Sequence, residues 1–427
     1  MASRRQVSGL GGRDWRRRGS VSPRVLLLAI AAVGLGGCER TKDSPAAPWS
    51  DVINVRNSTV LPRHLHAHRI ALGLPNDRDP DLALLPGGGL LLAMFRPVHH
   101  ANGSYQENLI LYRSRDGGET WGEREILPLP GREPHFSVLH DGTVFLTARL
   151  LSPDDRNPEG YDHAAVYRSV DAGATWSTLP VLAQDLPGAA PRAQTRTSRN
   201  ILELQDGSLV MGVSSASGAD YLWRSFDQGE TWDRSLPSQV RGYDVSLQAR
   251  PWYGEMTLFQ ARNGDLLGMA RAPANAVAPF LNTQTPAVNH DTDRLLLFRS
   301  GDGGRTWAPS ADIGDAYGEV CPSLLRLTDG RMLLTFSVRG PRPPLGLQAV
   351  LGAERPNGVS LNFATDRLLL TEKAPVGEAG SGCGNTVRLP GGQLVSAYSY
   401  RAGTATRVEV VRWVLPYDVT VADAWAR

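Results

Sequence analysis

The chain has 427 residues, of which 41% are apolar and 21% are charged. This composition is typical of a globular protein and excludes collagen-like, disordered and multi-span membrane chains. The formal net charge is +2, but residues 1–37 hold seven arginines and one acid, Asp14, so they carry +6 and the remainder carries −4. The net charge of residues 38–427 therefore gives no support for a basic nucleic-acid-binding surface.

Residues 1–37 have the segment order of a signal peptide. An arginine-rich stretch up to Arg24 precedes the apolar run 25–35, and the small residues Gly36 and Gly37 follow. The run is too short to span a bilayer comfortably. We therefore predict that residues 1–37 are a cleaved signal peptide. Residues 38–50, polar and rich in proline and alanine, are predicted to be a tether.

Residues 35–38, Leu-Gly-Gly-Cys, resemble the lipobox of bacterial lipoproteins. The resemblance implies that Cys38 becomes the lipidated N-terminus of an exported protein, anchored to a bacterial membrane in the periplasm or at the cell surface. A simple secretory cleavage beside an incidental cysteine is the alternative. Two further cysteines, Cys321 and Cys383, then lie in a compartment where disulfides persist.

Four segments share the pattern Ser-x-Asp-x-Gly-x-Thr-Trp, namely residues 114–121, 169–176, 225–232 and 300–307. Such self-similarity indicates a repeat architecture. Each segment follows a β-rich run, and its Asp and Gly favour a tight hairpin turn from which the Trp enters the next strand. Residues 358–361 are expected to be a worn fifth copy. We interpret these boxes as structural.

A second repeat consists of an apolar strand, a two-residue turn and another apolar strand. It occurs six times, and its turn glycines are 54 to 66 residues apart. This spacing predicts an all-β fold over residues 51–427, a six-bladed β-propeller of four-stranded antiparallel blades that leaves no long sheet edge exposed. Because the sixth blade runs out of chain, a strand from residues 52–71 is expected to complete it. The turn glycines are Gly88, Gly142, Gly207, Gly264, Gly330 and Gly392.

Boxes of this kind on a six-bladed propeller resemble the sialidase (neuraminidase) superfamily, where they are called Asp boxes. The resemblance covers nearly the whole mature chain. It implies that the boxes lie away from the active site, which forms where the innermost strands begin at one mouth of the central channel. The boxes also occur in proteins with other activities, so function has to be argued from residues at that mouth.

The resemblance implies that an arginine cluster holds an acidic sugar. Sialidases bind the substrate carboxylate with three arginines, because the planar guanidinium matches a carboxylate with two hydrogen bonds. An arginine at a strand start also serves simply as an ion pair between blades. The predicted substrate-binding residues are Arg78, Arg96, Arg132, Arg271 and Arg342, with Arg339 as a less favoured alternative to Arg342.

The catalytic positions depart from the family pattern. In the family a tyrosine activated by a glutamate is the nucleophile and an aspartate is the acid and base. This chain has Cys383 where the tyrosine is expected, Ser399 at a further glutamate position, and no carboxylate directly after Arg96. Substitutes are a histidine, His100 or its neighbour His99, and two Tyr-Gly-Glu motifs. The predicted catalytic residues are Glu255, Glu319, Tyr317 and His100, and Tyr253 with Glu255 is the second such pair.

Cys321 and Cys383 lie at the starts of adjacent inner strands, so a disulfide between neighbouring blades and a reactive thiol are both open, the disulfide being favoured. No ligand spacing supports a metal, and no cofactor is expected. The sequence favours a monomeric exo-glycosidase acting on an acidic sugar. The alternative is a propeller that binds glycans or assembles surfaces without catalysis.

Overall fold

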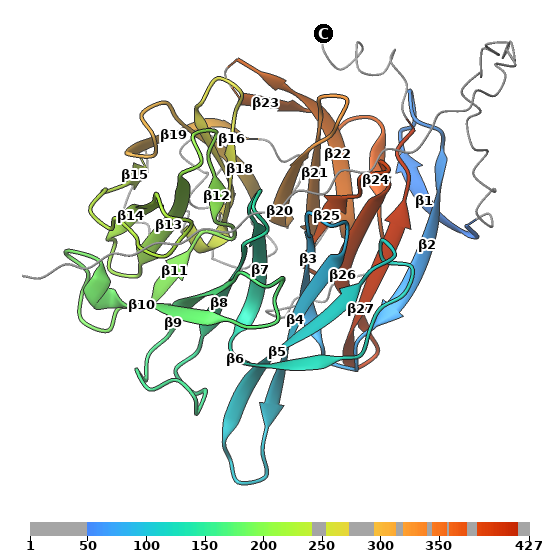
Figure 1. Cartoon of the computed structure of the whole chain (residues 1–427). Helices are drawn as coiled ribbons and strands as arrows, with labels where there is room; N and C mark the ends of the chain where they lie inside the picture. Colours follow the sequence, from blue (N-terminus) through green and yellow to red (C-terminus); the bar gives the residue numbers. More distant parts are fainter. Residues whose placement is uncertain are drawn as a thin grey trace, which may run out of the picture. The chain divides into compact units, whose positions relative to one another are not determined.

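A computed structural model describes residues 49–240, 253–272, 294–312, 319–339, 344–356, 358–373 and 382–416 (Figure 1). They form strands β1 to β27 and two short 3-10 helices, η1 (Ala183–Asp185) and η3 (Tyr253–Glu255). In the described part of the chain no helix is long and apolar enough to cross a membrane. The predicted all-β class is confirmed. Tyr317, Arg342 and Cys38 lie outside the described residues.

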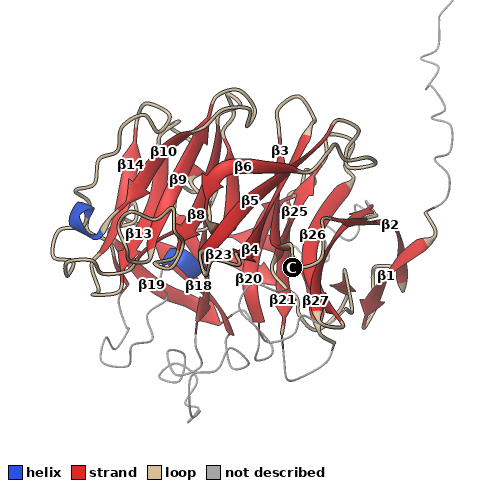
Figure 2. Cartoon of the chain, turned by 90° about the horizontal axis from the view of Figure 1, so that it is seen from below, coloured by secondary structure: helices blue, strands red, loops and turns tan. Residues whose placement is uncertain are grey.

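Four sheets are separate, and nearly all of their strand pairs are antiparallel (Figure 2). The first comprises β3 (Arg78–Leu84), β4 (Leu90–His99), β5 (Tyr105–Ser114) and β6 (Glu125–Pro130). The second comprises β7 (Arg132–Val138), β8 (Val144–Leu150), β9 (His163–Ser169) and β10 (Ser177–Val181). The third comprises β11 (Thr195–Thr197), β12 (Leu202–Glu203), β13 (Leu209–Ser215) and β14 (Asp220–Ser225). The fourth comprises β15 (Gln239–Val240), β16 (Met256–Gln260), β17 (Leu266–Ala272), β18 (Arg294–Ser300) and β19 (Thr306–Asp312), with β15 parallel to β19.

The remaining strands form one larger sheet that unites the two ends of the chain. Its members are β20 (Glu319–Arg326), β21 (Arg331–Val338), β22 (Gly346–Arg355), β23 (Gly358–Leu361), β24 (Arg367–Leu369), β25 (Gly384–Arg388), β26 (Leu394–Ala402) and β27 (Ala405–Trp413), with β1 (Asp51–Arg56) and β2 (His64–Leu72). Strand β2 pairs with β27 in antiparallel register, Ala67 opposite Trp413. The expectation that residues 52–71 supply the closing strand is thus confirmed.

The worn box expected at residues 358–361 stays a prediction. These residues form strand β23, which pairs with β22, and Val359 packs in the core. The segment lacks the Asp that organises the other boxes, so its backbone continues the sheet.

All six hairpins turn in the same way. In the first, the Gly88 N–H donates to the Leu85 carbonyl and the Leu85 N–H donates to the Gly89 carbonyl. Gly88 has φ +83°, a left-handed backbone that an L side chain rarely adopts. The five other turn glycines have φ between +81° and +92°. The recurring glycine is therefore required by the backbone of the turn.

Each box is organised by its Ser and Asp. In the first box, Ser114 Oγ accepts from the Gly118 N–H and donates to Asp116, whose carboxylate accepts from the backbone and hydroxyl of Thr120. The other three boxes repeat these bonds. The expectation that the box Trp enters a strand holds only for Trp307 in β19.

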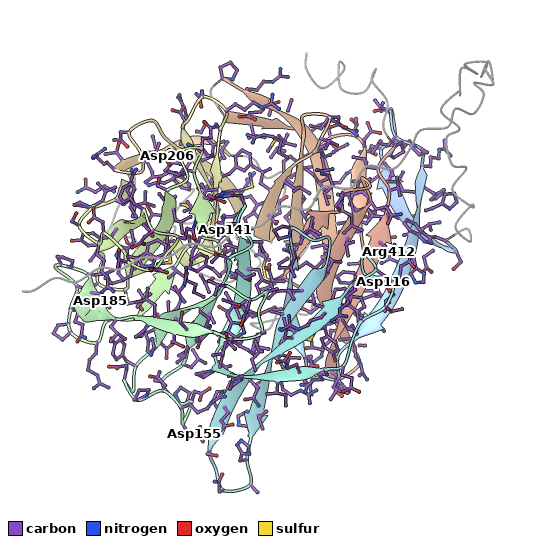
Figure 3. All side chains as sticks on the ribbon, viewed as in Figure 1. Asp116, Asp141, Asp155, Asp185, Asp206 and Arg412 are labelled. Atoms are coloured by element: carbon purple, nitrogen blue, oxygen red, sulfur yellow. A yellow bond between two sulfur atoms is a disulfide. The ribbon has the colours of Figure 1, made fainter. Side chains whose placement is uncertain are left out.

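An arginine from the preceding sheet binds each box. Arginine precedes each box serine, and three of these four arginines reach the box of the next sheet, whereas Arg299 binds Asp265 of its own sheet. Arg113 donates to the carbonyls of Ala172 and Gly173, Arg168 to Gln228, and Arg224 to Gly303. Arg412 on β27 pairs with Glu119 in the first box, and Figure 3 shows Arg412 beside Asp116 of that box. These four contacts join consecutive sheets, including the last to the first.

Six apolar clusters lie in the described part of the chain, five between neighbouring sheets and one, between β21 and β26, within the larger sheet. Leu91 and Phe95 of β4, for example, pack with Leu146 of β8, while Leu90 and Met94 on the other face of β4 pack with residues of β26 and β27. Both faces of a sheet are thus buried against its neighbours, which explains why the strands read as almost continuous apolar runs. The other clusters lie between β8 and β13, β13 and β17, β17 and β21, and β21 and β26.

Hydrogen bonds also link the innermost strands in a closed circuit. Asn385 and Asn200 each clamp a neighbouring strand by accepting from a backbone N–H and donating to a carbonyl. The successive links are Asp81 with Phe136, Ser137 with Ile201, Asn200 with Leu258, Thr257 with Pro322, Thr386 with Thr335, and Asn385 with Leu82. The circuit fixes the strand starts that surround the centre.

We predict that Arg168→Ala destabilises the fold by about 1–2 kcal/mol. The reason is the loss of a charged donor 2.9 Å from the Gln228 carbonyl of the next box. Urea unfolding followed by tryptophan fluorescence measures the effect. Arg115→Ala, at an exposed position of the first box, is the control, and equal midpoints for the two variants would contradict the role of Arg168.

Low pH should reduce the contribution of the box aspartates to the stability of the fold. Hydrogen bonds from Thr231 and Ser225 lower the pKa of Asp227 to about 2, so its stabilising effect is present above the unfolded-state value near 4 and is lost as the pH falls from about 4 to about 2. Asp227→Asn should therefore unfold at lower urea concentration than the parent at pH 7, and the gap should narrow toward pH 2. A gap that stays constant over this range would disprove the assignment.

Candidate functional site

A cavity of about 80 Å³ lies where the innermost strands begin. Four of the six links of the closed hydrogen-bond circuit contribute residues to its wall. The cavity lies at the end of the strands opposite the six hairpin turns and the boxes. Its lining residues include Asp79, Asp81, His135, Arg199, Asn200, Thr257, Cys321, Cys383 and Asn385. Ligand pockets usually measure about 300–1,000 Å³, so this cavity is suited to one terminal group of a larger ligand.

Three of the strands that reach the cavity carry the same backbone irregularity. Asp79, Glu133 and Cys321 all have left-handed backbones, with φ of +47°, +52° and +56°, and each precedes a proline. In each case the pairing register shifts across the residue. Such bulges redirect side chains, and non-glycine residues with positive φ concentrate at functional sites. The repetition in three strands marks this end as the candidate site.

Asp79 is the most perturbed carboxyl at the cavity. It is 4% exposed, and its Oδ1 has no hydrogen-bond partner among the described residues. Burial and the nearby charge of Glu133 raise its pKa to about 6, against the opposing effect of Arg339, Arg132 and His135. Asp79 therefore exchanges a proton close to neutral pH.

Arg132 lies at the centre of a group of charges beside Asp79. Its guanidinium is 3.4 Å from Glu107 and 3.3 Å from Glu133, and it stacks on Phe95. Burial lowers its pKa, but the surrounding carboxylates outweigh burial and raise it. Arg132 thus stays charged and holds its acidic neighbours in place.

Tyr105 and Glu107 form a phenol–carboxylate pair next to Arg132. The Tyr105 hydroxyl donates to Glu107 Oε1 at 2.5 Å. Burial and this hydrogen bond raise the pKa of Tyr105, and burial also raises the pKa of Glu107. The two residues face the same side of β5 because they are two positions apart.

Arg199 and His135 bring further polar groups to the cavity wall. Arg199 Nη1 is 3.3 Å from His135 Nε2, and His135 Nδ1 is 3.7 Å from Asp81. Arg339 Nη2 lies 3.6 Å from Cys383 Sγ and, as described above, acts electrostatically on Asp79. Arg199 therefore lines the cavity together with Asp79, and Arg339 acts on that acid from another sheet.

The structure brings only part of the predicted site together. Arg78 begins β3 next to Asp79, and Arg132 belongs to the charge group. Glu319 begins β20 and is fully buried, and Arg271 lies on β17. The backbone of Glu255 lies in η3, but its side chain is outside the described part.

Two predicted residues lie apart from the cavity lining. Arg96 Nε is 2.7 Å from the buried Asp77, which Arg124 also contacts, so Arg96 ties β4 to the segment before β3. His100 is exposed in the turn of the long β4–β5 hairpin at the bottom of Figure 1. Its neighbour His99 packs on Tyr105, with ring centres 4.8 Å apart.

Sequence reasoning missed Asp79, Glu133, Arg199 and the Tyr105–Glu107 pair as site residues. A usable signal was present, because Arg-Asp-Pro at 78–80 and Arg-Glu-Pro at 132–134 are separated by the same 54 residues as their turn glycines. For the Tyr105–Glu107 pair, the sequence offered only the two-residue spacing that places both side chains on the same face of a strand.

Cys321 and Cys383 form a disulfide, which confirms the favoured alternative. It joins the starts of two inner strands and lines the cavity. Cys383 therefore supplies a structural link at the position where the resemblance placed a nucleophile. Ser399, at the other substituted position, accepts a hydrogen bond from the Gly382 N–H. Within the described ranges no group of three His, Cys, Asp or Glu residues could hold a metal.

We predict that Asp79→Asn stabilises the protein at neutral pH. Between pH 4 and pH 6 the unfolded state loses a proton that folded Asp79 keeps, so the parent loses up to about 3 kcal/mol over this range and Asn removes that loss. Thermal unfolding of both proteins at pH 4 to 8 measures the difference. A variant less stable than the parent at pH 7.5 would contradict the burial argument.

Replacing both cysteines by serine should cost about 4 kcal/mol of unfolding free energy, because the disulfide closes a loop of 62 residues. Comparing the double variant with reduced parent in guanidinium separates the cross-link from the side-chain change. Equal stability of oxidised and reduced parent would disprove the contribution.

Comparisons with known proteins agree with this fold. No family model matches the chain. A sialidase of Micromonospora viridifaciens is 27% identical over 188 residues, which cover 38% of this chain and 29% of that protein. A sialidase of Paraclostridium sordellii is 24% identical over 53% of this chain and 55% of its own length. A Paenibacillus xyloglucanase is 28% identical over 41% of this chain and 16% of its own length. The chain thus spans only part of each relative.

Solved structures show the same architecture. A protein of unknown function from Dyadobacter fermentans has a TM-score of 0.62 at 19% identity, covering 85% of this chain and all of that one. The leech intramolecular trans-sialidase has a TM-score of 0.56, and the NanB sialidase of Streptococcus pneumoniae 0.55, both at 13% identity over 79% of this chain and 68% of theirs. The chain is therefore sialidase-like in fold and, over part of its length, in sequence.

Proposed function

We propose that this chain is a six-bladed propeller that acts on glycans as an exo-glycosidase for an acidic sugar. Six hairpins, six apolar clusters and a closed circuit of inner strands support the blade count. Sialidases and xyloglucanases among the relatives support a glycan as the substrate class. The small volume of the cavity supports action at a chain end.

The observation that carries the proposal is a buried, proton-exchanging acid among arginines. Asp79 lines the cavity together with Arg199, and Arg132 and Arg339 act on it electrostatically. A guanidinium binds a sugar carboxylate with two hydrogen bonds. A carboxylic acid with a pKa near 6 is suited to protonate a leaving oxygen.

Catalysis is favoured over binding alone by the state of the carboxyl groups. A purely binding surface has no need of perturbed acids, whereas Asp79 and Glu107 both have raised pKa values beside Arg132. A non-catalytic glycan-binding propeller is the second candidate, because a disulfide cysteine and Ser399 occupy two positions where the family carries reactive groups.

The remaining sequence predictions belong to the same proposal. Residues 1–37 are proposed as a signal peptide and Cys38 as the lipidated residue, which would place the site outside the cytoplasm. Among the predicted ligand-binding residues, Arg78 and Arg132 have the strongest support, because both flank a bulge at the cavity. Glu255, Glu319, Arg271, Tyr317 and Arg342 stay predictions.

The proposal is tested by incubating the protein from Glu39 onward with sialosides, uronic-acid glycosides and neutral glycosides. We expect release of a terminal acidic sugar. Arg199→Lys should raise the KM for that substrate about tenfold or more, because lysine cannot make the paired hydrogen bonds, and should change kcat less.

The matched control is Arg401→Lys, an exchange of the same kind on β26, where Arg401 donates to the Gly403 carbonyl of its own turn. Binding without release across the panel would favour the second candidate. The proposal would be refuted if the protein neither released nor bound any acidic sugar.

A further inference from the structure

Two neighbouring inner strands present an acid in the same way. Arg78-Asp79-Pro80 on β3 and Arg132-Glu133-Pro134 on β7 have equivalent places in their sheets, with the acid left-handed and the register broken across it. The strands are adjacent, since the Phe136 N–H donates to Asp81 at 2.8 Å. The same bulge presents a disulfide cysteine at Cys321, so it is a shared way of presenting a side chain at this end of the strands, and on β3 and β7 that side chain is a carboxylic acid.

The surroundings of the two acids differ. Asp79 is almost completely buried, whereas the Glu133 side chain is 35% exposed and lies 3.3 Å from the Arg132 guanidinium. Burial favours the protonated form of Asp79, and a cation and solvent favour the ionised form of Glu133. The groups that face Asp79 are Arg132, Glu133 and His135 of β7, Arg339 after β21, and its β3 neighbours Arg78 and Asp81. A protonated acid beside an ionised one is the arrangement that hydrolysis of a glycosidic bond requires.

The spaces beside the two acids fit one acid that donates a proton and one that activates water. Asp79 lines the central cavity, and Glu133 lines an adjoining hollow of about 30 Å³. His135 lines both spaces, which therefore lie beside the same side chain. Arg149, Arg196 and Thr197 contribute polar groups to the wall of the hollow, beside Ala148, Ala164 and Gly254, and its volume exceeds the roughly 10–15 Å³ that one water molecule needs.

We propose that Asp79 is the proton donor and Glu133 the general base of a hydrolysis in which water attacks from the side hollow. This inference rests on the proposed function and names its chemistry. The Asp79 carboxyl gives its proton to the glycosidic oxygen as the bond from that oxygen to the anomeric carbon breaks, and the leaving group departs as an alcohol. Glu133 takes a proton from water while the water oxygen bonds to the anomeric carbon. Proton exchange with solvent then returns Asp79 to its protonated form and Glu133 to its ionised form. The product has the inverted anomeric configuration.

Glu107 is the competing carboxyl. It is 1% exposed, its Oε1 binds the Tyr105 hydroxyl, and it lines neither space. Glu107 therefore supports Arg132 from behind, whereas Asp79 and Glu133 line the spaces that a ligand and a water can enter.

The first test needs no substrate. The carboxyl of Asp79 is followed by carbon-13 NMR titration in the parent, in Glu133→Gln and in Glu123→Gln. Glu123 is an exposed glutamate between the first box and β6, which makes it the matched control. We expect Glu133→Gln to shift the midpoint of Asp79 to lower pH and Glu123→Gln to leave it unchanged. No difference between the two variants would overturn the coupling of the pair.

The second test uses the terminal acidic sugar that the parent releases, carried once on an alcohol leaving group and once on 4-nitrophenol. Asp79→Asn should lose 100-fold or more in kcat on the alcohol glycoside and less than tenfold on the 4-nitrophenyl glycoside, which departs without a proton. Glu133→Gln should lose 100-fold or more on both. Proton NMR of the first product formed should show inversion.

Three results would overturn the inference while leaving the proposed function intact. They are equal losses by Asp79→Asn on both leaving groups, full activity of Glu133→Gln, and retention of configuration. Loss of activity in Tyr105→Phe with full activity in Glu133→Gln would transfer the second role to the phenol. If the parent binds the sugars but releases none, both the catalytic roles and the exo-glycosidase activity are refuted. The NMR titration would then show only that Glu133 acts electrostatically on Asp79.

Discussion

The pairing of β2 with β27 is the contact on which the rest of the molecule depends. Each sheet buries both faces against its neighbours, so an open row of sheets would leave an apolar face in water at each end. The N-terminal strand closes the last sheet, and Arg412 then reaches Glu119 of the first box. Closure also brings Asn385 to Leu82, which completes the circuit of inner strands around the cavity.

The two ends of the strands have separate roles. At one end, turn glycines and boxes satisfy the backbone locally, and an arginine of the preceding sheet ties each box to that sheet. At the other end, Asp79, Glu133 and Cys321 adopt left-handed backbones. Asp79 and Cys321 line the cavity, and Glu133 lines the side hollow. The turns and boxes stabilise the regular end, and the strained, charged groups that chemistry needs lie at the irregular end, which the Cys321–Cys383 disulfide stabilises.

The fold was largely predictable because its signals are local and repeated. The period of Gly88 and its counterparts predicted the hairpins, and the missing strand of the last sheet predicted the closure by β2. The segment 358–361 forms strand β23 and lacks the Asp whose hydrogen bonds organise the four complete boxes. The site was less predictable. Arg96 fitted a family spacing, yet its guanidinium is held by Asp77, a partner that only the folded chain brings near.

The redirection of Asp79 by its bulge depends on backbone geometry, which the sequence shows only as Arg-Asp-Pro. Its burial depends on strands from distant repeats, and its raised pKa depends on Glu133 of the next sheet. These are tertiary properties, so reasoning by position within one repeat could not supply them. Only a comparison of Arg-Asp-Pro at 78–80 with Arg-Glu-Pro at 132–134, at equivalent places in adjacent repeats, could have pointed to Asp79 and Glu133 from the sequence.

The most direct test of the account is a crystal structure of the protein with N-acetylneuraminic acid or galacturonic acid bound. The account predicts a sugar at the mouth of the cavity, with its carboxylate on an arginine of the Arg132, Arg199 and Arg339 group and its anomeric centre toward Asp79. A sugar bound at the turn and box end of the strands, or no sugar at saturating concentration of either acid, would contradict it.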